Sequence, residues 1–530
     1  MVRAGGGRSS NRSRRTLIMA RPHRRPRRNR VTEKVPQIGW KEFSNPYPPI
    51  EILSEEDLEK IHQASLQLLA ETGIRLLDPD GRQRLKNAGA DIDEDTQMVR
   101  FDPEFVMEQV ALAPAEFKLY ARNSAYDLAI GGNRIVFSSV MCPPFANDLD
   151  RGRRAGTFDE MCEFVKIIHA LNAVHQAGGG GFEPMDLPVE SRHLDVALAH
   201  ALLTDKSWKA WSNGRIRARD AIEMAKIMMQ CDDEELARKP VLTGPINTNS
   251  PLQIDRVMSE GIVEMARAGQ PLVIAPFTMA GAMSPATEAG ALTVQNAEAL
   301  AGCALSQVVR PGTPVIYGSY LTNVDMRSGS PLFGTPVFAK TTWASGQLAR
   351  RYGLPFRSSM NTGSNTVDAQ AAYETEMSLW AAVMGHANIL FASAGWLEGG
   401  LSASYEKLVL DAEILQLMIE SMEPIKVDDD SIALEATRQV GPGGHFFGAD
   451  HTLARYQNAF YQPLLSDTRN YETWHEQGRD NAETRANGIW KRLLEEYQQP
   501  AIDTGVEEEL REYVAKRKNE INNGKGRPEL

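Results

Sequence analysis

Short apolar stretches alternate with helical patterns along the middle of the chain. Each stretch ends in small polar or aromatic residues, and each precedes a segment whose apolar residues recur every three or four positions. The stretches lie at residues 135–140, 173–181, 207–214, 239–247, 270–279, 313–320, 354–360 and 388–395. Eight such strand-then-helix units predict an α/β protein with a (β/α)8 TIM barrel. The alternative is an open doubly wound sheet, which needs no closure but usually has fewer units.

The segments on either side of this region have patterns of their own. Ser54 and three acidic residues precede a helical pattern, which is typical of a helix start, and a strand-like stretch follows at Met98–Phe101. After Glu420 only helices are predicted, at Ser431–Val440, Glu476–Tyr497 and Gly505–Lys518. We therefore divide the chain into a disordered basic tail (1–40), a small N-terminal α/β cap (41–132), the barrel (133–422), a C-terminal helical extension (423–518) and a frayed tail (519–530).

The composition narrows the classes of protein. With 42% hydrophobic residues among 530, the chain has enough apolar material for a sizeable core. No apolar run reaches the roughly 20 residues that a membrane span needs, so no membrane partner is expected. The four cysteines are widely spaced and form no C-x-x-C motif. This pattern predicts neither a disulfide framework nor a directly bound metal, and favours reduced thiols in a cytoplasmic protein.

The charge is distributed unevenly. Residues 1–32 contain eleven Arg and no Lys, Asp or Glu, and without them the formal net charge of -11 becomes -22. This tail is a poor signal peptide because it has no long apolar core. Contact with RNA or a membrane is the alternative to a solvated tail. The acidic remainder of the chain argues against a nucleic-acid partner.

Polar and aromatic residues cluster where the predicted strands end. In a TIM barrel the carboxyl ends of the strands converge on one mouth, where the chemistry takes place. The predicted mouth contains Ser138, Ser139, Gln176, Trp211, Asn213, Asn247, Phe277, Met279, Tyr317, Ser319, Tyr320, Ser359, Asn361, Trp396 and Glu398. This set has neither clustered metal ligands nor an acid–base pair. Lys209, close to Trp208 and Trp211, is a candidate for a Schiff-base lysine.

A mouth with many rings and few carboxylates suits a quaternary ammonium ion. Such a cation donates no hydrogen bond and is held by aromatic faces, each worth about 0.5–2 kcal/mol. We expect Trp211, Phe277, Tyr317 and Trp396 to form this cage, with Glu398 as the counter-charge and a candidate catalytic residue. Ordinary packing is the alternative role of each ring.

Three blocks of sequence carry a family resemblance. They are VDAQAAYE (Val367–Glu374), AGWLEGGL (Ala394–Leu401) and SYEKLVLDAEI (Ser404–Ile414). In this order they resemble the trimethylamine methyltransferase (MttB-like) family, in its non-pyrrolysine branch, which is similar to glycine betaine:corrinoid methyltransferases. The likeness covers about residues 49 to 478. It implies the TIM-barrel fold and transfer of a methyl group from a methylated amine to Co(I) of a corrinoid (cobalamin) carried by a separate protein.

The implied reaction agrees with the residues at the mouth. Because Co(I) is itself the nucleophile, the enzyme needs no nucleophilic Ser, Cys or His. A quaternary substrate releases a neutral tertiary amine, so the site has only to hold the carbon in line and exclude water. Pyrrolysine is absent, and the segment expected at its place is Thr362–Asp368. We therefore expect glycine betaine or a related betaine rather than trimethylamine.

The resemblance suggests further site residues. A betaine carboxylate needs Arg, Lys or backbone N–H donors, and the candidates are Arg357, Asn361 and the backbone amides of Gly178–Gly181. Gly178 and Gly179, by close backbone approach, and His445 are the candidates for contact with the corrinoid.

One position departs from the betaine enzymes. Some family members that look like betaine enzymes have a histidine before the AGW motif, where this chain has Ala392. This difference counts against glycine betaine itself. It leaves His386 as a candidate catalytic residue, and packing at the end of a helix is the alternative.

Three functions stay open at this point. They are a corrinoid-dependent methyltransferase for a quaternary or tertiary amine, a barrel lyase or aldolase working through Lys209, and a non-catalytic binding protein for methylated amines. In each case the partner is a small molecule, and we expect a homo-oligomer.

Overall fold

A computed structural model describes residues 34–528 of the chain. The chain divides into two compact units, Met1–Lys34 and Val35–Leu530, and the account below concerns the second. The predicted basic tail lies outside the described residues as far as residue 33. In the described part of the chain, no helix is both long and apolar enough to span a membrane.

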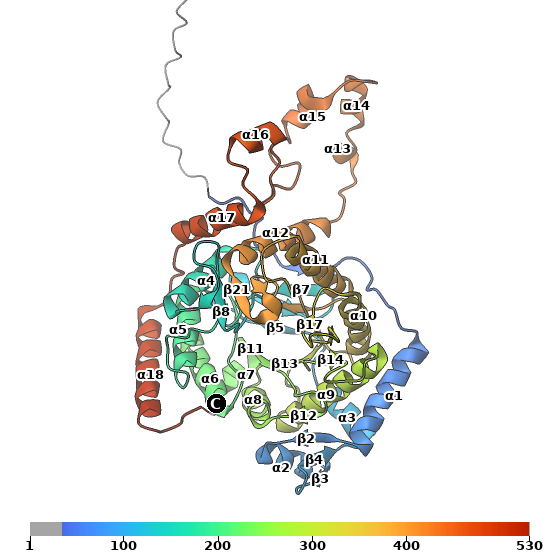
Figure 1. Ribbon diagram of the computed structural model, residues 1–530, viewed down its shortest axis with the longest axis vertical. Helices are drawn as coiled ribbons and strands as arrows, with labels where there is room; N and C mark the ends of the chain where they lie inside the picture. Colours follow the sequence, from blue (N-terminus) through green and yellow to red (C-terminus); the bar gives the residue numbers. More distant parts are fainter. Residues whose placement is uncertain (1–33, 529–530) are drawn as a thin grey trace, which may run out of the picture. The chain divides into compact units, whose positions relative to one another are not determined.

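The centre of the fold is a curled sheet of eight strands, seven of them parallel (Figure 1). The parallel strands, in sheet order, are β7 (Arg134–Phe137), β19 (Ile389–Phe391), β18 (Phe356–Ser359), β15 (Val315–Gly318), β13 (Leu272–Ile274), β11 (Leu242–Ile246) and β10 (Trp208–Lys209). β1 (Phe43–Ser44) pairs antiparallel with β7 at the edge. Two single parallel bridges, Ser138–Gln176 and Ala177–Trp208, link β7 through residues 176 and 177 to β10.

The predicted strands agree with this sheet. Seven of the eight apolar stretches contain a parallel strand, and the stretch at 173–181 provides the two bridges. β13 and β19 are buried at every position, which is typical of parallel strands covered on both faces. The α/β prediction with a parallel sheet is therefore confirmed.

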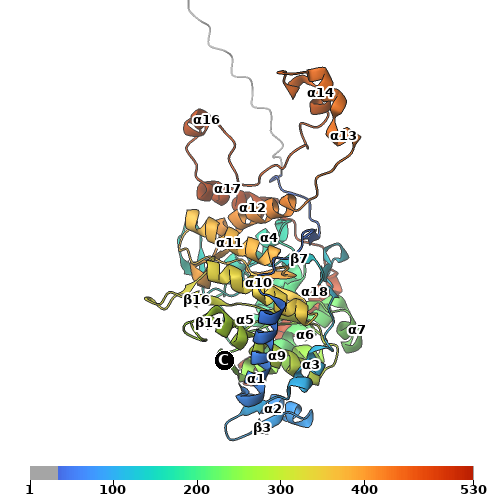
Figure 2. The same cartoon turned by 90° about the vertical axis from the view of Figure 1, so that its right-hand side faces the viewer.

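Helices cover the outside of the sheet (Figures 1 and 2). Those that follow the predicted strands are α4 (Phe158–Ala170), α5 (Arg192–Leu203), α6 (Arg215–Met229), α8 (Arg256–Arg267), α9 (Glu288–Val309), α10 (Pro336–Arg351), α11 (Ala369–Met384) and α12 (Tyr405–Ser421), with the short α7 (Asp233–Arg238) before β11. These helices begin where a side chain can accept hydrogen bonds from the first backbone N–H groups. Thr157 and Glu160, for example, form a complete capping box at the start of α4.

The N-terminal region shares a sheet with a loop of the central region. Its elements are α1 (Glu55–Glu71), β2 (Ile74–Leu76), α2 (Pro79–Asn87), β3 (Asp91–Asp93), β4 (Met98–Arg100), α3 (Pro103–Val110), β5 (Phe117–Leu119), η1 (Ser124–Tyr126) and β6 (Leu128–Ile130). β12 (Gln253–Ile254), which lies between β11 and α8, pairs with β2 at the edge of the order β12-β2-β4-β3. Ser54 caps α1, as its sequence predicts.

Two small sheets are built from the segments that follow central strands. One consists of β20 (Trp396–Leu397), β21 (Ser402–Ser404), β8 (Phe145–Asn147) and β9 (Arg154–Ala155), with η2 (Glu398–Gly400) between β20 and β21. The other consists of β14 (Met279–Ala280), β16 (Thr322–Val324) and β17 (Pro331–Leu332). The sequence did not predict them, because strands of two or three residues carry no periodicity.

The C-terminal part is helical, with boundaries that differ from the prediction. It contains α13 (Asp429–Ile432), α14 (Leu434–Val440), η3 (Phe446–Gly448), α15 (Asp450–Leu453), α16 (Tyr471–Glu476), α17 (Ala482–Glu496) and α18 (Thr504–Asn522). The predicted helix Ser431–Val440 is broken at Ala433, whose φ is 51°. α18 continues four residues beyond its predicted end at Lys518.

The sequence predicts Ser402 as the cap of the helix that carries Tyr405, Glu406 and Asp411, and this prediction is wrong. The side chain that caps α12 is that of Ser404, which accepts from the backbone N–H of Lys407, whereas Ser402 donates to Glu398. Ser402–Ser404 form β21 and pair with β8, so the helix begins only after the strand ends.

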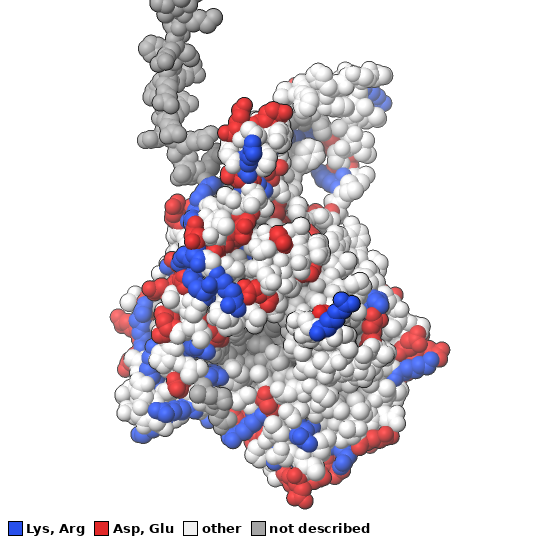
Figure 3. Space-filling view, in the orientation of Figure 1, with Lys and Arg blue, Asp and Glu red and all other residues white. Residues whose placement is uncertain are grey.

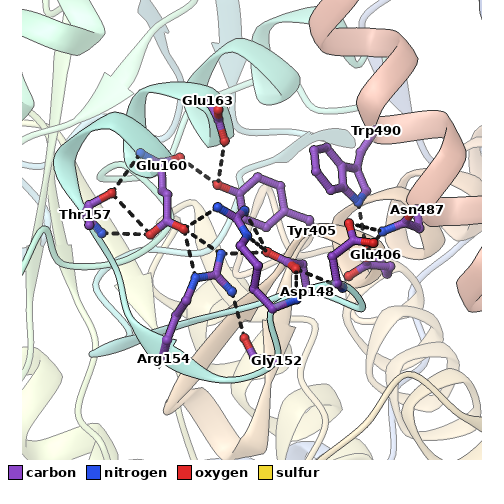
Figure 4. A network of polar contacts seen from close by, with 12 residues as sticks. Asp148, Gly152, Arg154, Thr157, Glu160, Glu163, Tyr405, Glu406, Asn487 and Trp490 are labelled. Atoms are coloured by element: carbon purple, nitrogen blue, oxygen red, sulfur yellow. Dashed lines mark hydrogen bonds and ion pairs between the residues drawn. The ribbon is translucent and has the colours of Figure 1, made fainter.

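A network of polar contacts ties the loop after β8 to α4, α12 and α17 (Figure 4). Arg154 contacts both Asp148 and Glu160, and the Tyr405 hydroxyl donates to the Glu160 carbonyl. On the other side, Glu406 accepts from Trp490. These contacts hold the start of α12 in place directly after the hairpin that carries Trp396.

Candidate active site

A cavity of about 360 Å³ opens where the central strands end. Its walls come from residues of β10, β11, β18 and β19, from the segments after β7, β10, β11, β13, β15 and β19, and from Glu183 and α8. The face of the molecule in Figure 3 is hollowed near its middle. The lining residues are Met141, Cys142, Glu183, Lys209, Ala210, Trp211, Ser212, Asn213, Pro245, Asn247, Met258, Ala275, Tyr320, Arg357, Phe391, Ala392, Trp396 and Gly400. This is the end of the sheet at which parallel α/β proteins place their chemistry.

Lys209 reaches this cavity from β10 with most of its hydrogen-bonding capacity unused. The side chain is buried, and its Nζ donates to the backbone carbonyl of Ser139 at 3.1 Å and lies 3.9 Å from the centre of the Phe391 ring. Burial lowers the pKa of Lys209 to about 7, and the charge of Arg357 acts in the same direction.

Lys206, a buried lysine three residues before Lys209, has all its hydrogen bonds within the protein. Its Nζ donates to three backbone carbonyls, those of Ile168, Leu171 and Val174, so each of its three protons has an acceptor. Burial lowers its pKa to about 7 as well. Lys209 differs because its three protons have one acceptor among the described residues, which leaves two protons for a ligand.

Arg357 is the second buried cation, and it lies on β18. Its Nη1 donates to the carbonyl of Ser319 at 3.0 Å, and its guanidinium lies 4.9 Å from the ring centres of both Tyr320 and Phe391. The Nε–H is buried with no acceptor among the described residues. Burial lowers the pKa of Arg357 to about 10.

These two cations make the cavity positive. Neither Lys209 nor Arg357 has a carboxylate partner in the part of the chain that the structure describes. The one carboxylate in the lining, Glu183, is paired with Arg192 at 2.9 Å. Burial raises the pKa of Glu183 and also that of the neighbouring Cys142 thiol. The site is therefore suited to a ligand that carries a negative charge.

Aromatic rings form another part of the wall. Trp396 and Tyr320 both line the cavity, with ring centres 6.3 Å apart and nearly perpendicular planes. The Trp396 indole N–H donates to the carbonyl of Thr362 at 3.1 Å, which fixes the ring. Trp211 also lines the cavity, and its buried indole N–H has no acceptor among the described residues.

Three of the six predicted substrate-binding residues line the cavity: Trp211, Trp396 and Arg357. The Phe277 ring is tilted against the Tyr320 ring, with centres 4.7 Å apart, and Asn361 donates to the Tyr320 hydroxyl at 3.0 Å; both contact Tyr320 and neither lines the cavity. Tyr317 points the other way, toward α9, where its hydroxyl donates to Asn296 at 3.0 Å. Side chains alternate along a strand, which explains its outward direction.

The two candidate catalytic residues lie elsewhere. Glu398 accepts from Arg153 at 2.7 Å and from Ser402 at 2.8 Å, and is not among the residues that line the cavity. His386 lies just after α11, where β19 begins, and its Nε2 contacts the carbonyl of Tyr47 at 2.8 Å. The cavity is at the opposite end of β19, so His386 is remote from it.

The residues predicted to contact a corrinoid lie in different surroundings. A Cβ at Gly178 would lie 2.2 Å from the Val140 carbonyl, and one at Gly179 would lie 2.6 Å from the Met141 side chain. These glycines therefore allow close packing within the chain. His445 is exposed and contacts the Phe447 ring.

Sequence reasoning missed Glu183, Phe391 and the pairing of Lys209 with Arg357. The signal for Lys209 was present, as a lysine between two tryptophans, but a ligand-binding role was not considered for it. The described residues contain no group of three or more His, Cys, Asp and Glu side chains placed to hold a metal ion.

Comparison with known proteins identifies the family. A family model described as trimethylamine methyltransferase (MTTB) matches residues 20–522. The chain belongs to the trimethylamine methyltransferase family. The resemblance carried by its three sequence blocks is thereby confirmed.

Individual relatives cover nearly the whole chain. The glycine betaine methyltransferase of Desulfitobacterium hafniense (strain Y51) is 38% identical over 475 residues, which are 89% of this chain and 98% of that protein. The trimethylamine methyltransferase MttB of D. hafniense (strain DSM 10664 / DCB-2) is 28% identical over 478 residues, covering 88% and 94%. MttB2 of Methanosarcina mazei is 26% identical over 491 residues, covering 88% and 95%.

A solved structure described as the hydroxylamine MtmB complex is similar over 87% of this chain and 88% of its own. The TM-score is 0.49 and the sequence identity is 10%, a similarity too low to bear on the site.

Proposed function

We propose that this protein is a corrinoid-dependent methyltransferase whose substrate is a betaine, a quaternary amine that carries a carboxylate. The observation that carries this proposal is the pair of buried cations in the cavity, Lys209 and Arg357, which have unused N–H donors and no carboxylate partner among the described residues. The membership of the trimethylamine methyltransferase family and the similarity to a glycine betaine methyltransferase support it.

The charge of the cavity distinguishes between methylated amines. At an effective dielectric constant of 20, two like charges 4 Å apart repel by about 4 kcal/mol. A simple cation such as a protonated or quaternary amine without a carboxylate would therefore be opposed by Lys209 and Arg357. A betaine has a carboxylate that accepts from these two groups and from the Trp211 indole N–H.

The rings of Trp396 and Tyr320 would hold the ammonium end of the substrate. The face of Tyr320 is already close to the Arg357 guanidinium, so Trp396 is the ring with its face left for the ligand. A carboxylate bound at Lys209 and Arg357 and an ammonium bound at Trp396 would fix both ends of the substrate. Because the nucleophile would come from a partner protein, holding the substrate in a fixed orientation is the main contribution of this chain to the rate.

A corrinoid on a partner protein would supply the nucleophile, Co(I), which takes the methyl group. Gly178 and Gly179 pack against Val140 and Met141, whereas His445 is exposed and stays a prediction for this contact. The residues of this chain bind the substrate, orient its methyl group and exclude water. No proton needs to be moved, because the tertiary amine that leaves is neutral.

We also propose that the central sheet closes into a barrel. The bridges through residues 176 and 177 support a closed (β/α)8 barrel, in which the segment 173–181 is the second strand. Under this interpretation residues 41–132 form the cap and residues 423–518 the helical extension.

A substrate panel tests the proposed function. Purified protein is mixed with cob(I)alamin and with glycine betaine, proline betaine, carnitine, choline or trimethylamine, and the change to methylcob(III)alamin is followed by its absorption spectrum. A betaine should give the fastest conversion. Conversion with no member of the panel, or trapping of a substrate on Lys209 by borohydride, would instead indicate the lyase or the binding protein.

The affinity for a betaine should fall as the pH rises through 7. Lys209 carries its charge below its pKa of about 7 and loses it above, so the carboxylate loses one of its two cations. We expect the dissociation constant to rise by up to about tenfold per pH unit above 7. Calorimetric titrations between pH 6 and 9 measure this, and Lys209→Arg, whose charge does not titrate in this range, is the control that should remove the dependence.

Replacing Trp396 by alanine should remove most of the recognition of the ammonium charge. The loss of one cation–π contact is worth about 0.5–2 kcal/mol, or roughly 2- to 30-fold in the dissociation constant of the betaine. The isostere 3,3-dimethylbutanoate, which keeps the carboxylate but lacks the ammonium charge, should lose much less. Equal losses for both ligands would show that Trp396 acts only by its shape.

A further inference from the structure

A second, much smaller cavity lies between β10 and the helices α5 and α6. Its volume is about 10 Å³, which is about the space that one water molecule or one monoatomic ion needs. Lys209 and Trp211 line both this cavity and the larger one described above. The lining residues whose side chains carry hydrogen-bonding groups are His193, Trp208, Lys209, Trp211, Arg217 and Asp220, and the rest of the lining is apolar.

Arg217 brings a buried charge without a partner to this small cavity. The residue is 7% exposed, its Nε–H is buried with no acceptor among the described residues, and its guanidinium lies 5.8 Å from the centre of the Trp211 ring. The carboxylate that acts on its charge is that of Glu183, which is already paired with Arg192 at 2.9 Å. Because a buried guanidinium N–H without an acceptor is costly, we expect a partner that is not part of the chain.

Other donors around the same cavity also lack acceptors. The Trp208 indole N–H is buried and has none in the part of the chain that the structure describes. Lys209 gives one proton to the carbonyl of Ser139, so that a second can serve the larger cavity and the third this one. Trp, Lys and Arg side chains can only donate hydrogen bonds. The small cavity therefore offers three N–H donors and two positive charges to its occupant.

The side chains around the cavity offer few acceptors. Asp220 is the one carboxylate in the lining, and its oxygens already accept from His193 at 2.9 Å and from Tyr513 and Arg517 at 2.8 Å. The Nδ1 of His193 is buried without a partner among the described residues, and it accepts only while the ring is neutral. A water molecule has two protons to donate and would find this one side-chain acceptor. An anion accepts from every donor and offsets the two charges.

We propose that this small cavity binds a monoatomic anion, chloride under ordinary conditions, held by Arg217, Trp208 and Lys209. The anion would compensate two cations that have no carboxylate partner in the described part of the chain. A carboxylate or a phosphate is too large for this space, so the site is distinct from the one proposed for the betaine. It needs no substrate in the larger cavity.

Crystals of the full chain grown in sodium chloride, and others grown in sodium bromide, locate the anion. Anomalous difference maps, recorded at long wavelength for chloride and at the bromine edge for bromide, should show a peak between Arg217, Trp208 and Lys209. A water molecule in the cavity with no anomalous peak in either salt would overturn the proposal. A peak that persists unchanged in Arg217→Met would do the same.

The stability of the protein in different salts measures the affinity. A ligand that binds only the folded protein raises the free energy of unfolding once its concentration exceeds the dissociation constant. Sodium chloride should therefore raise the midpoint of urea unfolding more than sodium gluconate at the same ionic strength, because gluconate is too large for the cavity. Arg217→Met should weaken the chloride affinity roughly 10- to 100-fold, the loss expected for one hydrogen bond to a charged group.

Arg219→Met is the matched control for this measurement. Arg219 also lies on α6, but it is exposed and contacts Glu264 at 3.0 Å outside the small cavity. The control variant should keep the chloride dependence of the wild type. Equal effects of the two salts on the wild type, or the same loss of chloride dependence in both variants, would contradict an anion site built around Arg217.

Discussion

Replacing Arg357 by methionine should abolish most of the turnover of a betaine while leaving the protein folded. The guanidinium is buried in the cavity and has no carboxylate partner among the described residues, so the charge it offers is available to the substrate. Removing one partner of a buried charge pair costs about 2–5 kcal/mol, which is about 30- to 5,000-fold in kcat/KM. Most of the loss should appear in KM, because the carboxylate is bound equally before and during methyl transfer.

Lys206→Met is the matched control for this prediction. Lys206 is also a buried cation, but all its protons are taken by backbone carbonyls. Its substitution should lower stability without changing the preference for a betaine over choline. An Arg357 variant that loses activity equally toward both substrates would contradict a role in binding the carboxylate.

Replacing Asp411 by alanine should lower the free energy of unfolding by about 3–5 kcal/mol. Lys407 and Asp411 form a fully buried ion pair on α12, and Lys407 also donates to Thr375 on α11 at 3.0 Å. Removing the carboxylate leaves a buried ammonium without its counter-charge, which is among the costliest changes in a protein interior. The backbone N–H of Gly395, which donates to Asp411 at 2.8 Å, loses its acceptor as well.

The double variant Lys407→Met/Asp411→Leu separates stability from activity. Because an apolar pair of similar volume often replaces a buried ion pair at little cost, urea unfolding should show most of the lost stability restored. Catalytic activity should be low in both Asp411→Ala and the double variant, because in both the backbone N–H of Gly395, which precedes Trp396, lacks its acceptor. A double variant no more stable than Asp411→Ala would show that the pair is not the cause of the loss.

The strands were predictable because burial on both faces makes them continuous apolar runs. Residues 272–274 and 389–391 are Leu-Val-Ile and Ile-Leu-Phe, and no other element gives such short, wholly apolar stretches with a helix after each. The helix caps were less certain. Ser402 and Ser404 satisfy the same rule, and the choice depends on the pairing of β21 with β8, which is a contact between residues more than 250 positions apart.

The site was only partly predictable, because the order of residues along the chain does not tell which strands face the same cavity. The residues at strand ends were identified from order along the chain, but Lys209 and Arg357 meet at the Phe391 ring only because their strands face the same cavity. The direction of Tyr317 toward α9 depends on register within β15, which an entirely apolar strand does not reveal. Glu183 lies in a loop without any pattern.

The most direct test of the central claim is a calorimetric comparison of three ligands at pH 6.5, with no corrinoid present. Glycine betaine carries both charges, tetramethylammonium carries only the positive one, and 3,3-dimethylbutanoate only the negative one. Binding of the betaine at least tenfold tighter than either analogue, and loss of that advantage in Lys209→Met/Arg357→Met, is the predicted result. Tetramethylammonium binding as tightly as the betaine would contradict a cavity built for a zwitterion.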